Sequence, residues 1–263
     1  MVTISVPGFL ASGISSGIKP NKKKDLALLF SDQPATAVGA FTTNQIQAAP
    51  VIISREKIKE SQSQAILVNS GNANACTGDM GMNHARDVCT WTASELGISE
   101  ALVIPSSTGI IGVPLPIDKI KVAIPPLVNA LSQTGLHDFA EAIMTTDTIP
   151  KIVAKKTNLD GKEVTFCGMA KGSGMIMPHM ATLLSFVISD LAVHPDLLHD
   201  VFLEALQHSF NSISIDGETS TNDMVIMMAN GRAGNSFFRN QSSDYQTFKS
   251  VLNSLFDLSL IHI

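Results

Sequence analysis

The sequence predicts an α+β or layered α/β fold, because short apolar runs of strand type alternate with longer runs of helical period and no internal repeat is present. The 263 residues are enough for one large or two modest domains with a real core. Hydrophobic residues make up 44% of the chain, charged residues 16%, and the net charge is -5. This balance is typical of a globular protein, and the lack of a basic patch argues against nucleic acid as the main partner.

Apolar runs bounded by Gly, Pro, Asn or Asp predict the strands. These runs are 26–30, 37–41, 64–69, 101–104, 151–157, 163–167, 183–188 and 224–229. Asp160-Gly161 lies between the fifth and sixth runs, and this dipeptide is typical of a tight hairpin turn. We therefore expect these two strands to pair.

Apolar residues at helical spacing predict the helices. The segments with this spacing are 83–96, 118–131, 137–144, 195–210 and 245–256. Gly97 follows the first segment, where a left-handed C-cap is expected. Pro195 opens the fourth segment, in the first turn, where the missing N–H of proline is tolerated.

Four loops that follow apolar runs contain most of the hydroxyl groups capable of chemistry. They span residues 69–78, 105–112, 145–148 and 216–223. Each loop by itself is more often an ordinary turn, since Ser, Thr, Asn and Gly favour turns for conformational reasons. The hypothesis of a functional site depends on their joint occurrence with Thr182.

Thr182 lies in the stretch Gly168–Asp190, directly before the apolar run 183–188, and so at the first position of the predicted strand. A threonine there is a plain choice for a strand, but it would become an N-terminal nucleophile if the chain were cut before it. Such a threonine carries nucleophile and base on one residue, since its freed α-amino group titrates near ~8 and accepts the hydroxyl proton. The Thr108-Gly109 turn would supply the donors for the developing oxyanion.

Other catalytic motifs fit less well. The sequence has neither a GxSxG elbow nor a GxxxxGK[ST] phosphate loop. Asp216, Glu218 and Asp223 miss the spacing of an EF-hand, so a hydrated acidic turn is the simpler interpretation and no metal site is expected.

Three cysteines, Cys76, Cys89 and Cys167, form no CxxC motif, and the simplest interpretation is reduced thiols in a reducing compartment. The first residues lack the pattern of a signal peptide, and no apolar run is long enough to cross a bilayer. We therefore expect a cytoplasmic protein.

The segment that ends at Thr182 reads Lys171-Gly-Ser-Gly-Met-Ile-Met-Pro-His-Met-Ala-Thr182. Further motifs are DLAL at 25–28, FTTN at 41–44, NSGNANACTG at 69–78, STGIIGVPLP at 107–116, TTDT at 145–148 and DGETSTND at 216–223. The segment resembles the self-cleavage segment of the ornithine acetyltransferase family, the bifunctional glutamate N-acetyltransferases of arginine biosynthesis, and the other motifs follow the order of that family. The resemblance covers residues 5–235 and implies a layered α/β/β/α sandwich of the N-terminal-nucleophile, aminopeptidase-like type.

The resemblance also implies a self-cleavage between Ala181 and Thr182. It would give an α chain, residues 1–181, and a β chain, residues 182–263. Thr182 would take the acetyl group of N-acetylornithine as an ester, and glutamate would then attack that ester to give N-acetylglutamate. Thr108 and Gly109 match the oxyanion pair of the family.

Thr145, Lys171 and Thr182 match the substrate-binding positions of the family, with Thr146 as the alternative to Thr145. The resemblance implies no cofactor, no metal and no membrane or nucleic-acid partner. It implies an assembly of two α and two β chains, and it leaves open whether acetyl-CoA is also a substrate. Residues 257–263 do not resemble the family, and we expect a chain truncated at its carboxyl end. The alternatives are an N-terminal-nucleophile amidohydrolase or aminopeptidase, and an inactive fragment.

Overall fold

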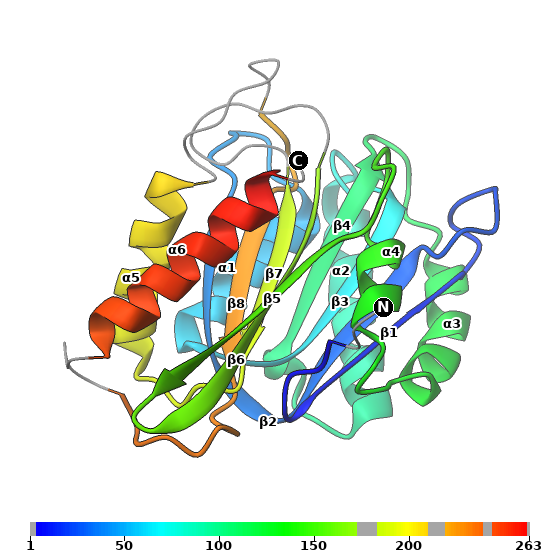
Figure 1. Cartoon of the computed structure of the whole chain (residues 1–263). Helices are drawn as coiled ribbons and strands as arrows, with labels where there is room; N and C mark the ends of the chain where they lie inside the picture. The colour runs from blue at the N-terminus through cyan, green and yellow to red at the C-terminus, as the bar shows by residue number, and fades with distance from the viewer. Residues whose placement is uncertain (1–3, 173–182, 210–218, 239–243, 262–263) are drawn as a thin grey trace.

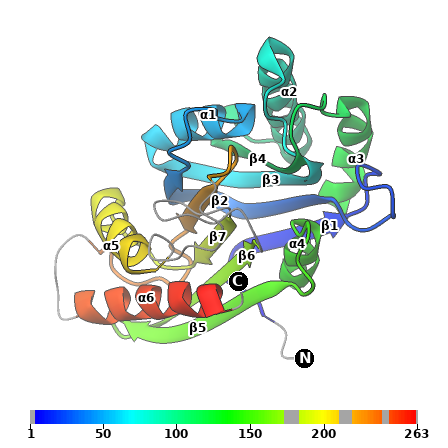
Figure 2. The ribbon, with the colours of Figure 1, turned by 90° about the horizontal axis from the view of Figure 1, so that it is seen from above.

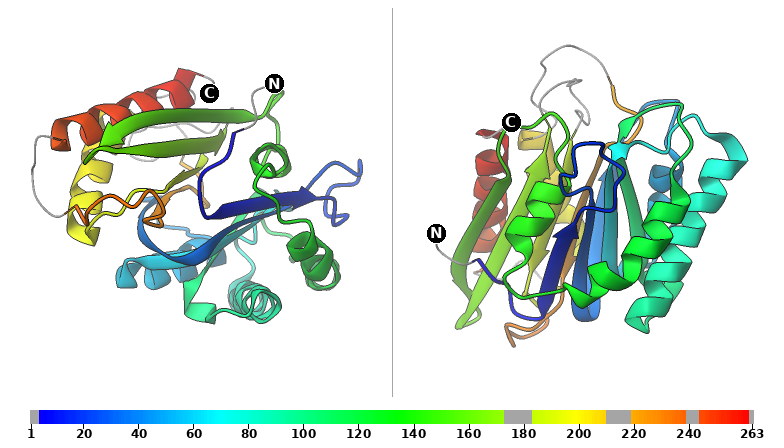
Figure 3. Two further views of the ribbon diagram at one scale, coloured as in Figure 1. Left: turned by 60° about the horizontal axis from the view of Figure 1, so that its bottom comes forward. Right: turned by 90° about the vertical axis from the view of Figure 1, so that its right-hand side faces the viewer.

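Four layers, two of helices outside and two of strands inside, make up the computed structural model, which describes residues 4–172, 183–209, 219–238 and 244–261. Helices α5 (Pro195–His208) and α6 (Tyr245–Ile261) cover one outer face, while α2 (Gly78–Leu96) and α3 (Ile117–Asn129) cover the other (Figures 1 and 3). This arrangement confirms the α/β/β/α sandwich.

All eight strands of the described residues belong to one continuous sheet. In spatial order they are β4 (Val103–Ile110), β3 (Gln62–Asn72), β2 (Leu26–Phe41), β8 (Met224–Ala229), β7 (Leu184–Ser189), β6 (Lys162–Lys171) and β5 (Lys151–Leu159), with β1 (Phe9–Ile14) beside the first half of β2. The pairs β3–β4 and β7–β8 are parallel, and the other neighbours are antiparallel.

The long strand β2 joins the two halves of this sheet. Its first residue, Leu26, pairs with Asn69 near the end of β3, and its last, Phe41, pairs with Met224 at the start of β8. The register shifts between Phe30 and Ala35, and the strand bends there, so both of its ends lie at the same end of the molecule (Figure 1).

The sequence predicts two separate strands in this region, and the structure corrects this to one. Pro34 lies within the irregular segment and is exposed. Proline has no N–H to donate to a ladder, but a bulge requires none, so the strand continues through it.

Alternation of side chains explains the three main apolar clusters. Ile66 of β3, Phe186 of β7 and Ile226 of β8 point between the half-sheets into the central core, whereas their neighbours in sequence point outward, against α2 and α3 on one side and α5 and α6 on the other. Helix α4 (Leu136–Ala142) lies at one side of the central core (Figure 2), with Phe139 edge-on to Phe186 at a centroid distance of 5.5 Å. The remaining helical segments are α1 (Ala49–Lys57) and the 3-10 turns Ile58–Glu60 and Glu100–Leu102.

The predicted boundaries are mostly confirmed. Gly97 ends α2 in the left-handed conformation with φ of 67°, and Asp160 and Gly161 turn the β5–β6 hairpin with φ of 54° and 69°. The run 101–104 is corrected, since its first two residues belong to a 3-10 turn before β4. No helix in the described ranges is both long and apolar enough to cross a membrane.

The three cysteines are free thiols, as expected, and they differ in accessibility. Cys76 is exposed, whereas Cys89 and Cys167 are buried. Burial raises the pKa of Cys89 to about 11 and that of Cys167 to about 12, and thiolate is the reactive form. We therefore expect a thiol reagent at pH 8 to label one cysteine in the native protein and three in urea. Labelling of Cys89 or Cys167 without urea would contradict their burial.

Candidate active site

Polar residues gather where five strands begin or end, at one end of the sandwich. Strands β3 and β4 finish there, β6 finishes at Lys171, and β7 and β8 begin there, since Lys171 pairs with Leu184, which in turn pairs with Met224. The Asn222 side-chain amide links the two halves of the sheet by donating to the Ala73 carbonyl at 2.6 Å and to the Ser107 carbonyl at 2.9 Å.

Thr108 and Gly109 lie at the end of β4, directly after Ser107. Gly109 has φ of +138°, and a Cβ there would lie 2.3 Å from the Gly71 carbonyl carbon, so only glycine fits. The hydroxyl of Thr108 has no hydrogen-bond partner within the described ranges, although the side chain is largely buried. Ser107 Oγ donates to Asn69 Oδ1 of β3 at 2.6 Å, and this bond holds the residue before Thr108 in place. The pair therefore has the rigidity and the free hydroxyl that an oxyanion site needs.

Lys171 is buried on the inward side of β6, with 4% exposure. Its Nζ donates to Thr145 Oγ1 at 3.3 Å, so Thr145 lies beside Lys171, and the choice of Thr145 rather than Thr146 stays a prediction. Burial lowers the pKa of Lys171, while Asp147 and Asp223 act in the opposite direction. A buried ammonium with one weak hydrogen bond is suited to an anionic group of a ligand.

Asp147 organises the loop between α4 and β5. Its carboxylate accepts from Lys151 Nζ at 2.7 Å, from the Gly172 N–H at 2.9 Å and from the Thr145 N–H at 3.2 Å. Burial opposes ionisation, but these donors, with Lys151 first, hold the pKa of Asp147 below its ordinary value. Asp147 thus fixes both Thr145 and the end of β6. In the sequence, only the four-residue spacing between Asp147 and Lys151 points to this role.

Asp223, expected in a hydrated turn, is buried with 1% exposure, so that interpretation is wrong for this residue. Within the part of the chain that the structure describes, its Oδ2 has no hydrogen-bond partner. Burial raises its pKa to about 7, against the effects of Ser220, Lys171 and the Leu183 N–H. In the sequence, the signal for this burial was the position of Asp223 directly before the apolar run of strand β8, which is fully buried.

Four residues singled out in the sequence, Ala181, Thr182, Asp216 and Glu218, lie outside the described residues. Leu183, which follows Thr182 in the chain, is described. Its carbonyl accepts from the Met224 N–H at 3.3 Å. Thr182 is therefore covalently attached to a residue that lies beside Asp223.

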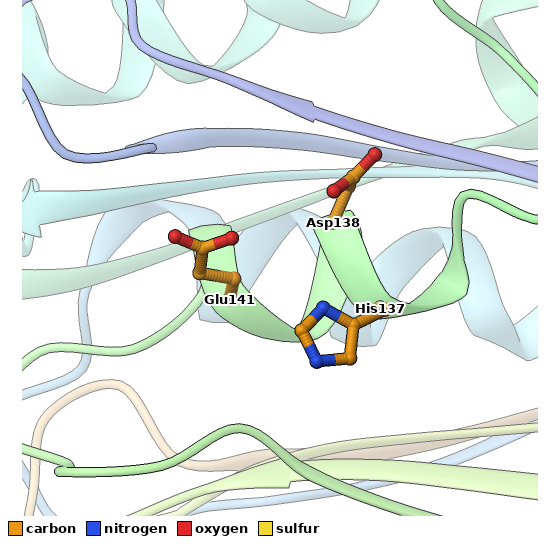
Figure 4. A group of neighbouring side chains, drawn as sticks. All are labelled: His137, Asp138 and Glu141. Carbon is orange, nitrogen blue, oxygen red and sulfur yellow. The ribbon is translucent and has the colours of Figure 1, made fainter. Parts of the chain in front are cut away.

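A second polar cluster, His137, Asp138 and Glu141, lies on α4 (Figure 4). Its potential ligand atoms lie within 4.8 Å of one another. Lys24 Nζ already pairs with Asp138 at 2.6 Å and with Glu141 at 2.8 Å. Since the groups are mostly exposed and the carboxylates are neutralised, we interpret the cluster as a surface ion-pair network.

The fold belongs to the N-terminal-nucleophile class. The solved L-aminopeptidase D-Ala-esterase/amidase of Ochrobactrum anthropi, described as a variant of the Ntn hydrolase fold, matches all of this chain and 87% of its own, with a TM-score of 0.60. Only 10% of the aligned residues are identical, so this likeness concerns the fold alone.

The chain belongs to the ArgJ family, whose sequence model matches residues 10–259. The arginine biosynthesis bifunctional protein ArgJ 1 of Clostridium acetobutylicum is 46% identical over 94% of this chain and 61% of its own length. The crystal structure of the Mycobacterium tuberculosis ornithine acetyltransferase complexed with ornithine is 34% identical, with a TM-score of 0.59, over 67% of this chain and 94% of that one. The chain thus spans less than two thirds of the length of the curated relatives it matches.

Proposed function

We propose that this chain is part of a glutamate N-acetyltransferase of arginine biosynthesis, which moves acetyl from N-acetyl-L-ornithine to L-glutamate through an ester on Thr182. The observation that carries the proposal is the convergence of Thr108-Gly109, Lys171 and the residue after Thr182 at one end of the sandwich. The name of the Clostridium relative and the bound ornithine of the mycobacterial one support the pathway and the substrate class.

The residues divide the chemistry among them. The Thr182 hydroxyl attacks the acetyl carbonyl, and the free amine of the same residue takes its proton. Thr108 and Gly109 donate to the oxyanion. Lys171, supported by Thr145, neutralises a substrate carboxylate. Ornithine leaves, and the glutamate amine attacks the ester, which gives ping-pong kinetics.

We further propose that the chain cleaves itself between Ala181 and Thr182. The strand order supports this, since β7 pairs with β6 and β8 pairs with β2, so the ladder would hold residues 1–181 and 182–263 together after the cut. The length of the mycobacterial polypeptide also supports the cleavage. Its match includes 94% of that polypeptide and 67% of this chain, or about 176 of the 263 residues. This length is close to the 181 residues that precede the proposed cut.

Within this proposal, no cofactor, nucleic acid or membrane takes part. Acetyl-CoA is a further possible acetyl donor, and the assembly is two α and two β chains. We place the reaction in the cytoplasm, where free thiols such as Cys76 remain reduced.

The test combines sequencing with an assay. The expressed chain should split into two pieces, the smaller beginning at Thr182, and should form N-acetylglutamate from N-acetylornithine and glutamate. Thr182→Ala should give one uncut band and no product. Cleavage of that variant at the same bond would disprove the role of Thr182. Acetate release without glutamate would favour a hydrolase, and cleaved protein without either product would indicate an inactive fragment.

A further inference from the structure

The proposed cleavage needs a base that the later acetyl transfer does not. During transfer, the free amine of Thr182 accepts the proton of its own hydroxyl. Before the cut, that nitrogen belongs to a peptide bond and has no lone pair available for a proton. Another group must therefore take the proton of the Thr182 hydroxyl and return it to the leaving nitrogen.

Besides Lys151, which pairs with Asp147, the described ionisable groups considered at the strand ends next to Leu183 are Asp147, Lys171 and Asp223. Asp147 is a poor base, because three donors already occupy its carboxylate. Lys171 is a buried cation whose nearest hydrogen-bond acceptor is Thr145. Asp223 differs from both, since its Oδ2 is buried and has no hydrogen-bond partner among the described residues. An unpartnered buried carboxylate oxygen is costly, and taking up a proton relieves that cost.

The position of Asp223 is fixed by the backbone on both sides. The Thr42 N–H donates to the Asp223 carbonyl at 2.9 Å, and the Met224 N–H donates to the Leu183 carbonyl at 3.3 Å. The Leu183 N–H donates to the Asp223 side chain. This N–H belongs to the peptide group that joins Leu183 to Thr182, so the Asp223 carboxyl contacts the peptide nitrogen that follows Thr182 in the chain.

We propose that Asp223 is the acid–base group of the self-cleavage at Ala181–Thr182. The inference rests on the proposed function, in which that bond is cut. The charged group that acts on Asp223 is Lys171. Lys171 in turn is surrounded by the charges of Asp147 and Lys151.

In the proposed self-cleavage, Thr182 Oγ attacks the Ala181 carbonyl carbon, and the proton of the hydroxyl passes to Asp223. The bond between Ala181 C and Thr182 N breaks, and Asp223 gives the proton to that nitrogen, which leaves an ester between Ala181 and Thr182 Oγ. Water hydrolyses the ester to the Ala181 carboxylate and the free hydroxyl. Because burial raises the pKa of Asp223 to about 7, both protonation forms are populated at neutral pH.

The experiment follows cleavage of the full chain, pulse-labelled in cell-free translation and shifted to pH 6.0–8.5. The rate should rise about fivefold from pH 6 to pH 7, about twofold more by pH 8, and level off above that, since the reaction starts from ionised Asp223. Asp223→Asn should cut at least ~100-fold more slowly at every pH, and Asp223→Glu should restore measurable cleavage with a displaced pH midpoint.

Asp190→Asn is the matched control. Asp190 is also buried, with a pKa raised by burial, but it follows the other end of β7 and accepts from the Thr165 N–H at 2.7 Å. Its cleavage rate and pH midpoint should match those of the wild type. Circular dichroism of each variant reports folding. A folded Asp223→Asn chain that splits at the wild-type rate overturns the role of Asp223 and leaves the proposed function standing. A wild-type chain that never splits overturns both.

Discussion

Gly109→Ala is expected to lower acetyl transfer by about 10²–10³-fold, the effect of losing an oxyanion donor. A Cβ at this position would lie 2.3 Å from the Gly71 carbonyl carbon and 2.5 Å from the Asn72 nitrogen. Both atoms are backbone of the neighbouring strand β3, so neither can rotate away. The turn must move, and Thr108 and the Gly109 N–H move with it. We also expect a stability loss on the order of 1–3 kcal/mol from overpacking.

Gly112→Ala provides the control for backbone strain. Gly112 also has positive φ, at +78°, but a Cβ there meets no atom within 4 Å. This variant should lose only about 1 kcal/mol, from the left-handed conformation, and should keep most of its transfer rate. The measurements are transfer kinetics and urea unfolding of both variants. Equal transfer rates in the two would show that the contact of Gly109 with β3 does not hold the oxyanion donors.

Asp147→Ala is expected to destabilise the fold by about 3–5 kcal/mol, the cost of leaving one partner of a buried ion pair uncompensated. The Lys151 and Asp147 side chains are 6% and 1% exposed, with 2.7 Å between Nζ and Oδ1. Without the carboxylate, the Lys151 ammonium remains buried, and the Gly172 and Thr145 N–H groups lose their acceptor. Urea unfolding at pH 7 measures the loss.

The same residue predicts a dependence of stability on pH. The pKa of Asp147 is lower in the folded protein than its ordinary value of 3.8. Its stabilising contribution is therefore complete above the unfolded value, about 3.9, and is lost as the pH falls through the folded value. Urea unfolding between pH 2 and pH 6 should show a shallower acid loss for Asp147→Ala than for the wild type. Parallel curves would refute this assignment.

Glu163→Ala is the matched surface control. Glu163 pairs with Lys156 at 2.6 Å, but the two side chains are 66% and 60% exposed. Exposed pairs contribute about 0–1 kcal/mol, because water screens them and the long side chains lose entropy on pairing. A loss for this variant as large as that of Asp147→Ala would mean that burial does not explain the difference.

Local signals in the sequence were sufficient for most elements. Gly97 ends a helix because glycine adopts the left-handed conformation without strain, and Asp160-Gly161 turns a hairpin for a related reason. These signals act within a few residues. The strand through Pro34 was missed because its continuity depends on a bulge opposite β3, which is a relation between distant segments.

The sequence by itself determined the family pattern and the layered class of fold, and it predicted four site positions that the structure describes: Thr108, Gly109, Thr145 and Lys171. Motifs and local conformational preferences encode these. Only the tertiary structure decided that Asp223 is buried with an unpartnered oxygen and that Asp147 is saturated with donors. The two residues are the same amino acid, and their pKa values shift in opposite directions because burial and hydrogen-bond donors come from strands and loops far away in the chain.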